Sequence, residues 1–409
     1  MAVYLIATFD TKGREAAFLR DRLKELGVDV RTVDAGCLNE PACEADVPRR
    51  ELFDAAGIDD RKLLERRDRG DAVKAAAAGA AAFIERLHGE GAVQGVIGIG
   101  GSAGTTIATA AMRQLPLGVP KLMVSTLASG MVRPWVKDKD ILMLNPVADI
   151  TGLNRITRSI LDQAARAMAG LVTLPVAGNA DAGTSRPVVA ATMFGVTTPC
   201  VEQARAVLEE AGCEVLVFHA TGSGGQAMES LIDEGLIDGV LDLTTTELAD
   251  ELVGGVLSAG PQRLTAAGQR GIPQVISVGA TDMVNFGPID SVPERFAGRR
   301  FYEHNPTVTL MRTTKDENRR LGAAIGRKAA AATGPVRILL PLHGVSAIDA
   351  AGQPFDDPDA RMTLFDAIAD HAGSLPIDRR DEHINDASFA QAAAAALLDM
   401  LPAVRARQD

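Results

Sequence analysis

Glycines and hydroxyl side chains dominate residues 98–106, and this combination of residue types indicates phosphate chemistry. Four glycines alternate there with one serine and two threonines, namely Gly98, Gly100, Gly101, Gly104, Ser102, Thr105 and Thr106. An apolar run at 93–97 precedes them and small residues at 107–112 follow, which predicts a strand, a turn and a helix start. A helix start carries N–H groups without intrahelical partners, and glycines let an anion approach them. We therefore expect a phosphate-binding loop, with a tight turn that packs helix on strand as the simpler alternative.

Neither of the two standard nucleotide motifs fits this loop. A Walker loop has a lysine directly after its last glycine, and Thr105 stands in that place. A dinucleotide fingerprint has its glycines after the first strand of the domain, whereas this loop follows the third predicted strand. A nicotinamide-dependent oxidoreductase is therefore the least favoured interpretation, and bound NAD in the first domain would be needed to revive it.

Two further turns carry polar groups that a parallel sheet would bring to the same edge. Asp10 and Thr11 follow the first predicted strand, and Ser125, Ser129 and Gly130 follow the fourth. Hydroxyls and N–H groups at these places would hold phosphate oxygens. Asp10 has two interpretations, because a carboxylate there either caps the following helix or holds Mg²⁺ directly or through water.

The second half of the chain offers separate candidate catalytic groups and no complete motif. Asp242, Asp282, His304 and His343 are predicted near strand ends, where together they would line a substrate pocket. No Gly-x-Ser-x-Gly elbow and no local metal-ligand spacing accompanies them. Hydrogen bonding within a loop is the simpler interpretation for each one alone. The glycine turn at 221–225 leads into a helix and repeats the anion-binding pattern with less force.

Alternating strands and helices must position these residues. Short apolar runs predict buried strands at 3–8, 28–33, 93–97, 120–124 and 141–144, and in the second half at 188–192, 213–219, 239–243, 273–278 and 336–340. Helical spacing separates most of them, which predicts an α/β fold with mainly parallel sheets flanked by helices. The pattern starts again after the small-residue loop 177–185, so we expect domains at 1–180 and 181–409. Residues around His304 are expected to form a loop, and 378–386 a charged segment between two closing helices.

Composition narrows the class of protein. The chain has 409 residues, a net charge of −11 and a pI near 5.2, which argues against binding to nucleic acid or to a membrane surface. Its four cysteines form no Cys-x-x-Cys pair, and its apolar start is too short for a signal peptide. We therefore expect a cytoplasmic protein with small-molecule ligands.

Several short motifs together resemble the ATP-binding domain family named after the tomato mosaic virus resistance protein. In the first half they are ATFDTKG at 7–13, GIGGSAGT at 98–105, STLASG at 125–130 and DITGLN at 149–154. In the second half they are FGVTTP at 194–199, FHATGSGG at 218–225 and PLHGVS at 341–346. The resemblance covers nearly the whole chain.

The resemblance implies two Rossmann-like domains, ATP with Mg²⁺ in the first domain, and a homodimer. The family's phosphate-holding loop corresponds to residues 100–105, with the turns at 10–11 and 125–130 beside it. Lys12, Arg133 and Arg155 are the candidates for a cationic clamp on the phosphates. We expect an enzyme that acts on a small anionic substrate in the cleft between the two domains. The alternative is a nucleotide-responsive regulatory or inhibitory module without turnover.

Overall fold

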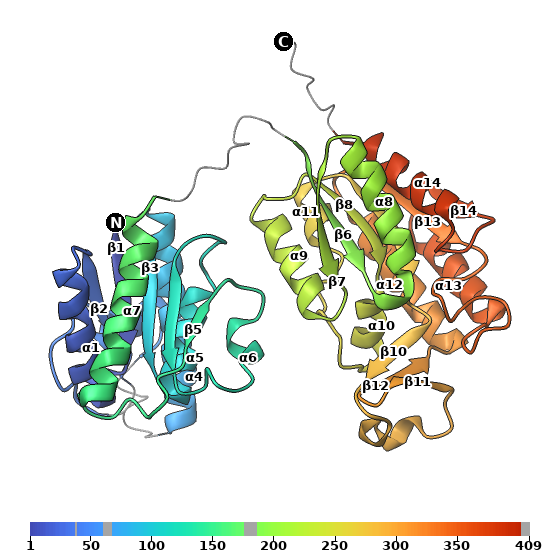
Figure 1. Cartoon of the computed structure of the whole chain (residues 1–409). Helices are drawn as coiled ribbons and strands as arrows, with labels where there is room; N and C mark the ends of the chain where they lie inside the picture. Colours follow the sequence, from blue (N-terminus) through green and yellow to red (C-terminus); the bar gives the residue numbers. More distant parts are fainter. Residues whose placement is uncertain (37–38, 60–67, 176–185, 402–409) are drawn as a thin grey trace, which may run out of the picture. The chain divides into compact units, whose positions relative to one another are not determined.

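The computed structural model describes residues 1–36, 39–59, 68–175 and 186–401. The chain divides into two compact units, Met1–Ala180 and Asp181–Asp409 (Figure 1). The small-residue loop expected to link the domains, at 177–185, lies outside the described residues.

The first unit is built on a five-stranded parallel sheet in the order β2-β1-β3-β4-β5. Its strands are β1 (Ala2–Ala7), β2 (Val30–Asp34), β3 (Val93–Gly100), β4 (Lys121–Ser125) and β5 (Leu142–Leu144). Every residue of β1 and β4 is buried, which explains why these strands appear in the sequence as continuous apolar runs without alternation.

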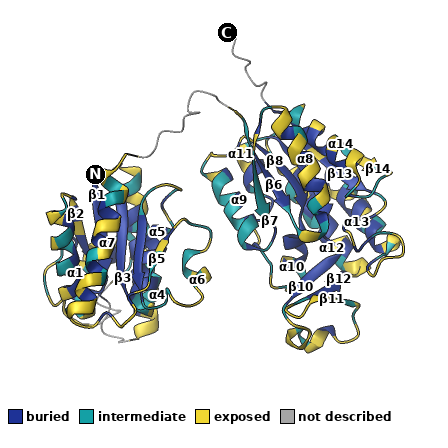
Figure 2. Ribbon diagram, viewed as in Figure 1, coloured by how far each residue is buried: buried dark blue, intermediate teal, exposed yellow. Residues whose placement is uncertain are grey.

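Helices cover both faces of this sheet (Figures 1 and 2). They are α1 (Phe9–Glu25), α2 (Arg49–Ala55), α4 (Arg69–Gly89), α5 (Ser102–Met112), α6 (Arg133–Val136) and α7 (Arg155–Thr173). Leu19 of α1 and Met168 of α7 share one apolar cluster with the sheet, whereas Phe83 of α4 and Ile107 of α5 belong to the cluster on the other face. The result is a three-layered α/β domain.

The second unit has a six-stranded parallel sheet in the order β7-β6-β8-β9-β13-β14. Its strands are β6 (Val188–Met193), β7 (Glu214–His219), β8 (Gly239–Thr244), β9 (Gln274–Gly279), β13 (Val336–Pro341) and β14 (Ile377–Arg380). The first five parallel strands of each unit therefore follow the same order, which gives the repeated sequence pattern a structural counterpart.

Helices also cover both faces of the second sheet. They are α8 (Thr198–Glu210), α9 (Ser223–Asp233), α10 (Thr246–Val253), α11 (Ala266–Arg270), α12 (Lys315–Ala330), α13 (Pro358–His371) and α14 (Ala387–Leu398), with short 3-10 turns at Gly195–Thr197, Ile289–Ser291 and Glu294–Phe296. Val201 of α8 and Phe389 of α14 pack on one face. Met228 of α9 and Leu321 of α12 belong to clusters that contact strands from the opposite face.

One expectation about local structure was wrong, and one strand was missed within a segment that does lie between the two closing helices. Residues around His304 form strands, because β10 (Met283–Phe286), β11 (Phe301–Asn305) and β12 (Val308–Arg312) make a three-stranded antiparallel sheet in the order β10-β12-β11. The charged segment at 378–386 begins inside β14, the edge strand of the large sheet, where charged side chains remain exposed to water. Among the described helices, none is both long and apolar enough to cross a membrane.

Candidate functional site

The sheet of the first unit changes direction between β1 and β3. The two strands are neighbours, yet the chain proceeds from β1 to β2 on one side and from β3 to β4 on the other. Ligands of open α/β sheets bind at the carboxyl ends of the strands at such a switch point. The turn after β1 and the glycine loop after β3 both lie there.

The glycines of the loop have different roles. A Cβ on Gly104 would lie 2.9 Å from the carbonyl oxygen of Ile99, and Gly100 has a φ of +157° with its missing Cβ 2.9 Å from the Cα of Gly104. These two glycines are needed for α5 to pack against β3. A Cβ on Gly101 would meet only the hydroxyl of Thr126, at 3.5 Å, so Gly101 leaves open space beside the start of α5.

The start of α5 keeps its backbone donors available. Gly101 is its N-cap and has no side chain with which to cap it, and the first internal bond runs from the N–H of Thr105 to the oxygen of Gly101 at 2.9 Å. Within the described part of the chain, no side chain accepts from the N–H groups of Ser102, Ala103 or Gly104. An anion at this place would meet N–H groups and the positive end of the helix dipole.

The hydroxyls of Thr105 and Ser125 join two loops. Their oxygens lie 2.6 Å apart and both residues are fully buried, while Thr105 also donates to the Gly101 oxygen at 2.8 Å. The oxygen of Ser125 also accepts from the N–H of Leu127 at 3.0 Å. Both side chains were expected to contact a ligand. In this structure both are buried and connect the loops after β3 and β4 through this contact, and their contact with a ligand stays a prediction.

Thr106 and the more exposed polar groups remain near the surface. The hydroxyl of Thr106 donates to the Ser102 oxygen at 2.9 Å and accepts from the indole N–H of Trp135 at 3.2 Å. Ser102, Ser129 and Gly130 are exposed. These residues are thus available to a ligand at the carboxyl edge.

The start of α1 is arranged differently from that of α5. Its N-cap is Thr8, so Asp10 lies inside the first turn and the interpretation of Asp10 as the N-cap was wrong. The Oδ1 of Asp34, at the end of β2, accepts from the N–H of Phe9 at 3.1 Å and of Gly36 at 2.7 Å. Burial raises the pKa of Asp34, and these two hydrogen bonds oppose the rise. An acid of the chain therefore already occupies the anion position at the start of α1.

Asp10 and Thr11 lie at the same edge. The Oδ2 of Asp10 accepts from the N–H of Asn39 at 3.3 Å, and the hydroxyls of Thr8 and Thr11 lie 2.7 Å apart. The described residues contain no group of three or more His, Cys, Asp or Glu side chains arranged to hold a metal. A Mg²⁺ at this edge would therefore take most of its ligands from phosphate oxygens and water, and few from the protein, as is common for Mg²⁺ bound with nucleotides.

A polar cavity of about 340 Å³ opens at the ends of β4 and β5. Its lining residues are Thr126, Ser129, Asn145, Val147, Ala148 and Asp149. Thr126 connects it to the glycine loop, because its N–H donates to the Gly100 oxygen at 3.3 Å and its hydroxyl is the nearest neighbour of Gly101. The cavity and the open start of α5 therefore adjoin each other.

Asp149 is the acid of this cavity. Its Oδ2 accepts from the Thr151 hydroxyl at 2.7 Å, and this hydrogen bond lowers the pKa of Asp149, as does the ammonium of Lys12. Lys12 is thus the clamp candidate that shares this edge with the cavity. Arg133 is the first residue of α6, and Arg155 is the first residue of α7.

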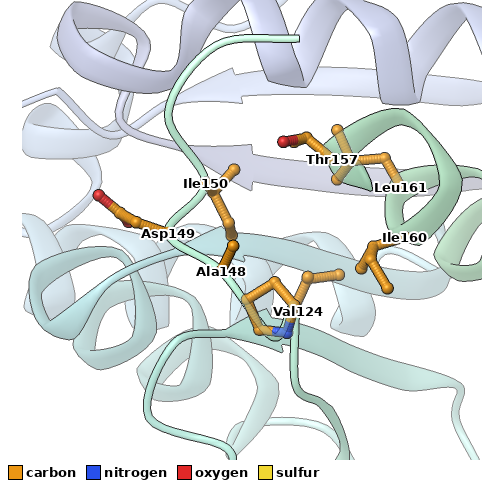
Figure 3. A pocket seen from close by; sticks show the side chains of 8 residues that line it. Val124, Ala148, Asp149, Ile150, Thr157, Ile160 and Leu161 are labelled. Carbon is orange, nitrogen blue, oxygen red and sulfur yellow. The ribbon is translucent and has the colours of Figure 1, made fainter. Parts of the chain in front are cut away.

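A narrow, mainly apolar seam lies beside the segment that carries Asp149 (Figure 3). Val124 of β4, Ile150, and Ile160 and Leu161 of α7 line it, and the space between them has no room for a water-sized molecule. Asp149 points away from Ile160 and Leu161 in this view. The seam therefore fixes the segment that carries Asp149 while leaving the carboxylate on the outer side.

The glycine turn of the second unit already holds an anion of its own chain. The Oε1 of Glu247 accepts from the N–H of Gly222 at 2.7 Å and of Gly225 at 3.0 Å, at the start of α9. The Oε2 of Glu247 accepts from Nε of Arg263 at 2.7 Å, and both residues are fully buried. An internal carboxylate therefore accepts the hydrogen bonds that the glycine turn at 221–225 was expected to offer to an anion.

The four candidate catalytic residues of the second unit do not form one cluster. Asp242 is buried in an ion pair with Arg263, whereas Asp282 accepts from the Ser346 hydroxyl at 2.8 Å in a separate buried cluster with Asp349 and Arg312. His304 is exposed on β11 of the antiparallel sheet. His343 lies after β13, is 58% exposed and pairs with Asp381 at 2.9 Å.

Sequence reasoning missed several residues of these sites. Asn145 and Val147 had no motif to mark them, because their place in the cavity depends on how the segment after β5 turns beside β4. Arg263 lies in a segment between α10 and α11 that carried no sequence signal. A buried arginine is recognisable only once its carboxylate partners are placed around it.

The folds of the two units define the class of this protein: it is a two-domain α/β protein with doubly wound, mainly parallel sheets. The chain belongs to the uncharacterised protein family UPF0261. The N-terminal domain of that family matches residues 1–177, and its C-terminal domain matches residues 186–401.

Relatives extend over nearly the whole chain. The UPF0261 protein of Clostridium tetani is 46% identical over 402 residues, which cover 98% of each chain. A UPF0261 protein of Rhizobium meliloti is 45% identical over 403 residues, covering 97% of this chain and 98% of the relative. The ToMV resistance protein Tm-1(GCR237) of Solanum lycopersicum is 38% identical over 424 residues. That match covers 98% of this chain and 56% of the tomato protein, and it confirms the similarity to the tomato mosaic virus resistance protein drawn from the motifs, while ATP binding stays a prediction.

Proposed function

We propose that the first domain binds ATP with Mg²⁺, with the phosphates held at the start of α5. One comparison carries this proposal. Three of the turns expected to bind an anion lead into helix starts, at α1, α5 and α9, and internal carboxylates accept from backbone N–H groups at two of them, Asp34 at α1 and Glu247 at α9. The start of α5 has no such carboxylate among the described residues, and its N–H groups adjoin a polar cavity. An external anion fits where the chain supplies none.

The charges around the loop are compatible with a triphosphate. Lys12 supplies a cation at the same edge, although this loop lacks a Walker lysine. Asp10, beside the switch point, is the acid that would contact Mg²⁺ while the phosphates supply further oxygens. Magnesium would reduce the repulsion between the triphosphate and the carboxylates of Asp10 and Asp149.

For the whole protein, the geometry favours the nucleotide-responsive binding module over the enzyme. An enzyme acting on a small anionic substrate would need polar groups that converge on it. Asp242 and Asp282 are buried and engaged in different clusters, and His304 and His343 lie on other elements. The name of the tomato relative, a virus resistance protein, is compatible with a role exerted on a partner. We propose that the protein is a nucleotide-responsive regulatory module that forms a homodimer in the cytoplasm.

Titration calorimetry with ATP, ADP and NAD, each with and without Mg²⁺, tests the nucleotide assignment. Gly101→Val fills the open space beside the start of α5, and we expect it to weaken ATP binding by roughly tenfold or more through lost charge-assisted hydrogen bonds. Gly89→Val is the matched control, because a Cβ there meets nothing within 4 Å and the position is exposed at the end of α4. Wild-type protein that ignores ATP, or a Gly101→Val variant with unchanged affinity, would refute the assignment.

A further inference from the structure

The lining of the cavity at the ends of β4 and β5 selects for a particular chemistry. It contains one carboxylate, one amide, two hydroxyls and two aliphatic side chains, but no cation. Thr151 and Lys12 favour the ionised form of Asp149. A phosphate or carboxylate group would be repelled from such a cavity, whereas a ligand that donates hydrogen bonds from hydroxyl groups would be attracted.

The cavity lies beside the proposed phosphate position. Thr126 lines the cavity and is also the nearest neighbour of a Cβ built on Gly101, at 3.5 Å. A ligand with phosphates at the start of α5 would therefore place its next chemical group in the cavity. In a nucleotide, that group is the ribose.

The wall of the cavity is held in an unfavourable backbone conformation. Val147 has a φ of +66°, which is rare for a β-branched residue, and the residue is 80% exposed. The N–H of Val147 donates to Oδ1 of Asn145 at 3.1 Å, and the N–H of Ala148 donates to the Pro146 oxygen at 2.7 Å. These bonds maintain the turn, and core packing does not explain the exposed valine. Such strain is concentrated at ligand-binding sites.

We propose that this cavity binds the ribose of the nucleotide, with Asp149 accepting hydrogen bonds from its hydroxyls and Val147 contacting an apolar face of the ligand. The inference rests on the proposed nucleotide site and adds the feature that selects a nucleotide over a simple polyphosphate. Asn145, Thr126 and Ser129 supply further hydrogen-bonding groups around the same ring.

Calorimetry with three probes separates the ribose from the phosphates: ATP, 2′,3′-dideoxy-ATP and inorganic tripolyphosphate, all with Mg²⁺. We expect wild-type protein to prefer ATP over the dideoxy analogue by roughly tenfold, the effect of a hydrogen bond to a charged group. Asp149→Ala should reduce that preference to about twofold or less without weakening tripolyphosphate binding, because the variant loses an acceptor for the ribose hydroxyls and also a negative charge near the phosphates. Thr151→Val is the matched control, because it removes the Thr151–Asp149 bond but keeps the carboxylate.

The outcomes distinguish the two proposals. Equal binding of ATP and dideoxy-ATP by the wild type, both weakened by Gly101→Val, would overturn the ribose assignment and leave the phosphate site intact. Loss of the preference for ATP in Thr151→Val as strongly as in Asp149→Ala would also overturn it. The Asp149 carboxylate would then act by holding the turn at 149–151 in place, and not by contacting the ribose. Failure to bind any of the three probes would refute both proposals.

Discussion

Arg263 binds Asp242 through two parallel hydrogen bonds, Nη1 to Oδ2 at 2.5 Å and Nη2 to Oδ1 at 2.7 Å, in the interior of the second domain. Glu247 and Glu229 also contact this guanidinium. The side chain of Arg263 is fully buried. One arginine thus compensates acids from β8, α10 and α9, and it explains why Asp242 is structural in spite of its position on a central strand.

Arg263→Met is therefore expected to destabilise the second domain strongly. The variant leaves Asp242 and Glu247 buried without their cation, and removal of one partner of a buried pair costs about 3–5 kcal/mol. Urea unfolding monitored by circular dichroism measures the change. Arg205→Met is the control, since Arg205 pairs with Glu209 on the exposed surface of α8, where a loss below about 1 kcal/mol is expected. Similar midpoints for the two variants would contradict the structural role of Arg263.

Gly225→Ala tests the internal anion site at the start of α9. A Cβ at Gly225 would overlap with Oε2 of Glu247, so the carboxylate must leave its two N–H donors or the turn must open. We expect a loss of several kcal/mol, on the order of 3, or failure to fold. Gly195→Ala is the matched control, because a Cβ there meets nothing within 4 Å. Equal melting temperatures for these variants would show that Glu247 does not fill this turn.

Asp282 makes the second domain sensitive to pH. Burial and the neighbouring Asp349 raise the pKa of Asp282 from 3.8 to about 7. The folded state therefore binds this proton more strongly than the unfolded state. The proton's contribution to the free energy of unfolding is complete below about pH 4 and is lost as the pH rises to about 7. An asparagine at this position cannot ionise. Asp282→Asn should therefore remove this contribution to the slope of the free energy of unfolding against pH, a contribution that approaches about 1.4 kcal/mol per pH unit for one proton.

Urea unfolding at intervals from pH 4 to 8 measures that difference. The variant should gain stability relative to wild type as pH rises through this range and reach a constant advantage above about pH 7. Asp366→Asn, an exposed acid of α13, is the control and should leave the slope unchanged. Parallel curves for wild type and Asp282→Asn would mean that Asp282 ionises in the folded protein as readily as in the unfolded chain.

The sequence predicted the parts of the fold that depend on local pattern. Buried apolar runs located the parallel strands, and the glycines of 98–104 located the start of α5. Strands such as β11 and β14 were missed, because they lie at sheet edges and carry charged or polar side chains that resemble a loop. Edge strands need no continuous apolar run, since one side of their backbone faces solvent.

Side-chain roles at the site depended on contacts that no local pattern records. Thr105 and Ser125 have the residue types of phosphate ligands, but they are buried against each other. Glu247 reaches the turn at Gly222 from another helix, and no spacing between the two indicates this. The distinction between a turn filled by an internal acid and one open to a ligand required the three-dimensional arrangement.

Val147→Asn tests whether the strained wall of the cavity exists for ligand binding. Asparagine adopts the left-handed conformation more readily than valine, and the 80% exposed valine side chain loses no core contact. We expect the variant to be more stable by about 1 kcal/mol and to bind ATP several-fold more weakly, roughly 0.5–1 kcal/mol, because an apolar contact is lost. Thermal unfolding and calorimetry on the same preparation measure both effects. Lys137→Asn is the control for affinity, since Lys137 is exposed outside the cavity lining, and its φ of 48° combines with a ψ of −114°, outside the left-handed helical region that asparagine favours. It should leave both affinity and stability nearly unchanged, and a Val147→Asn variant that gains stability without losing affinity would remove the link between strain and ligand.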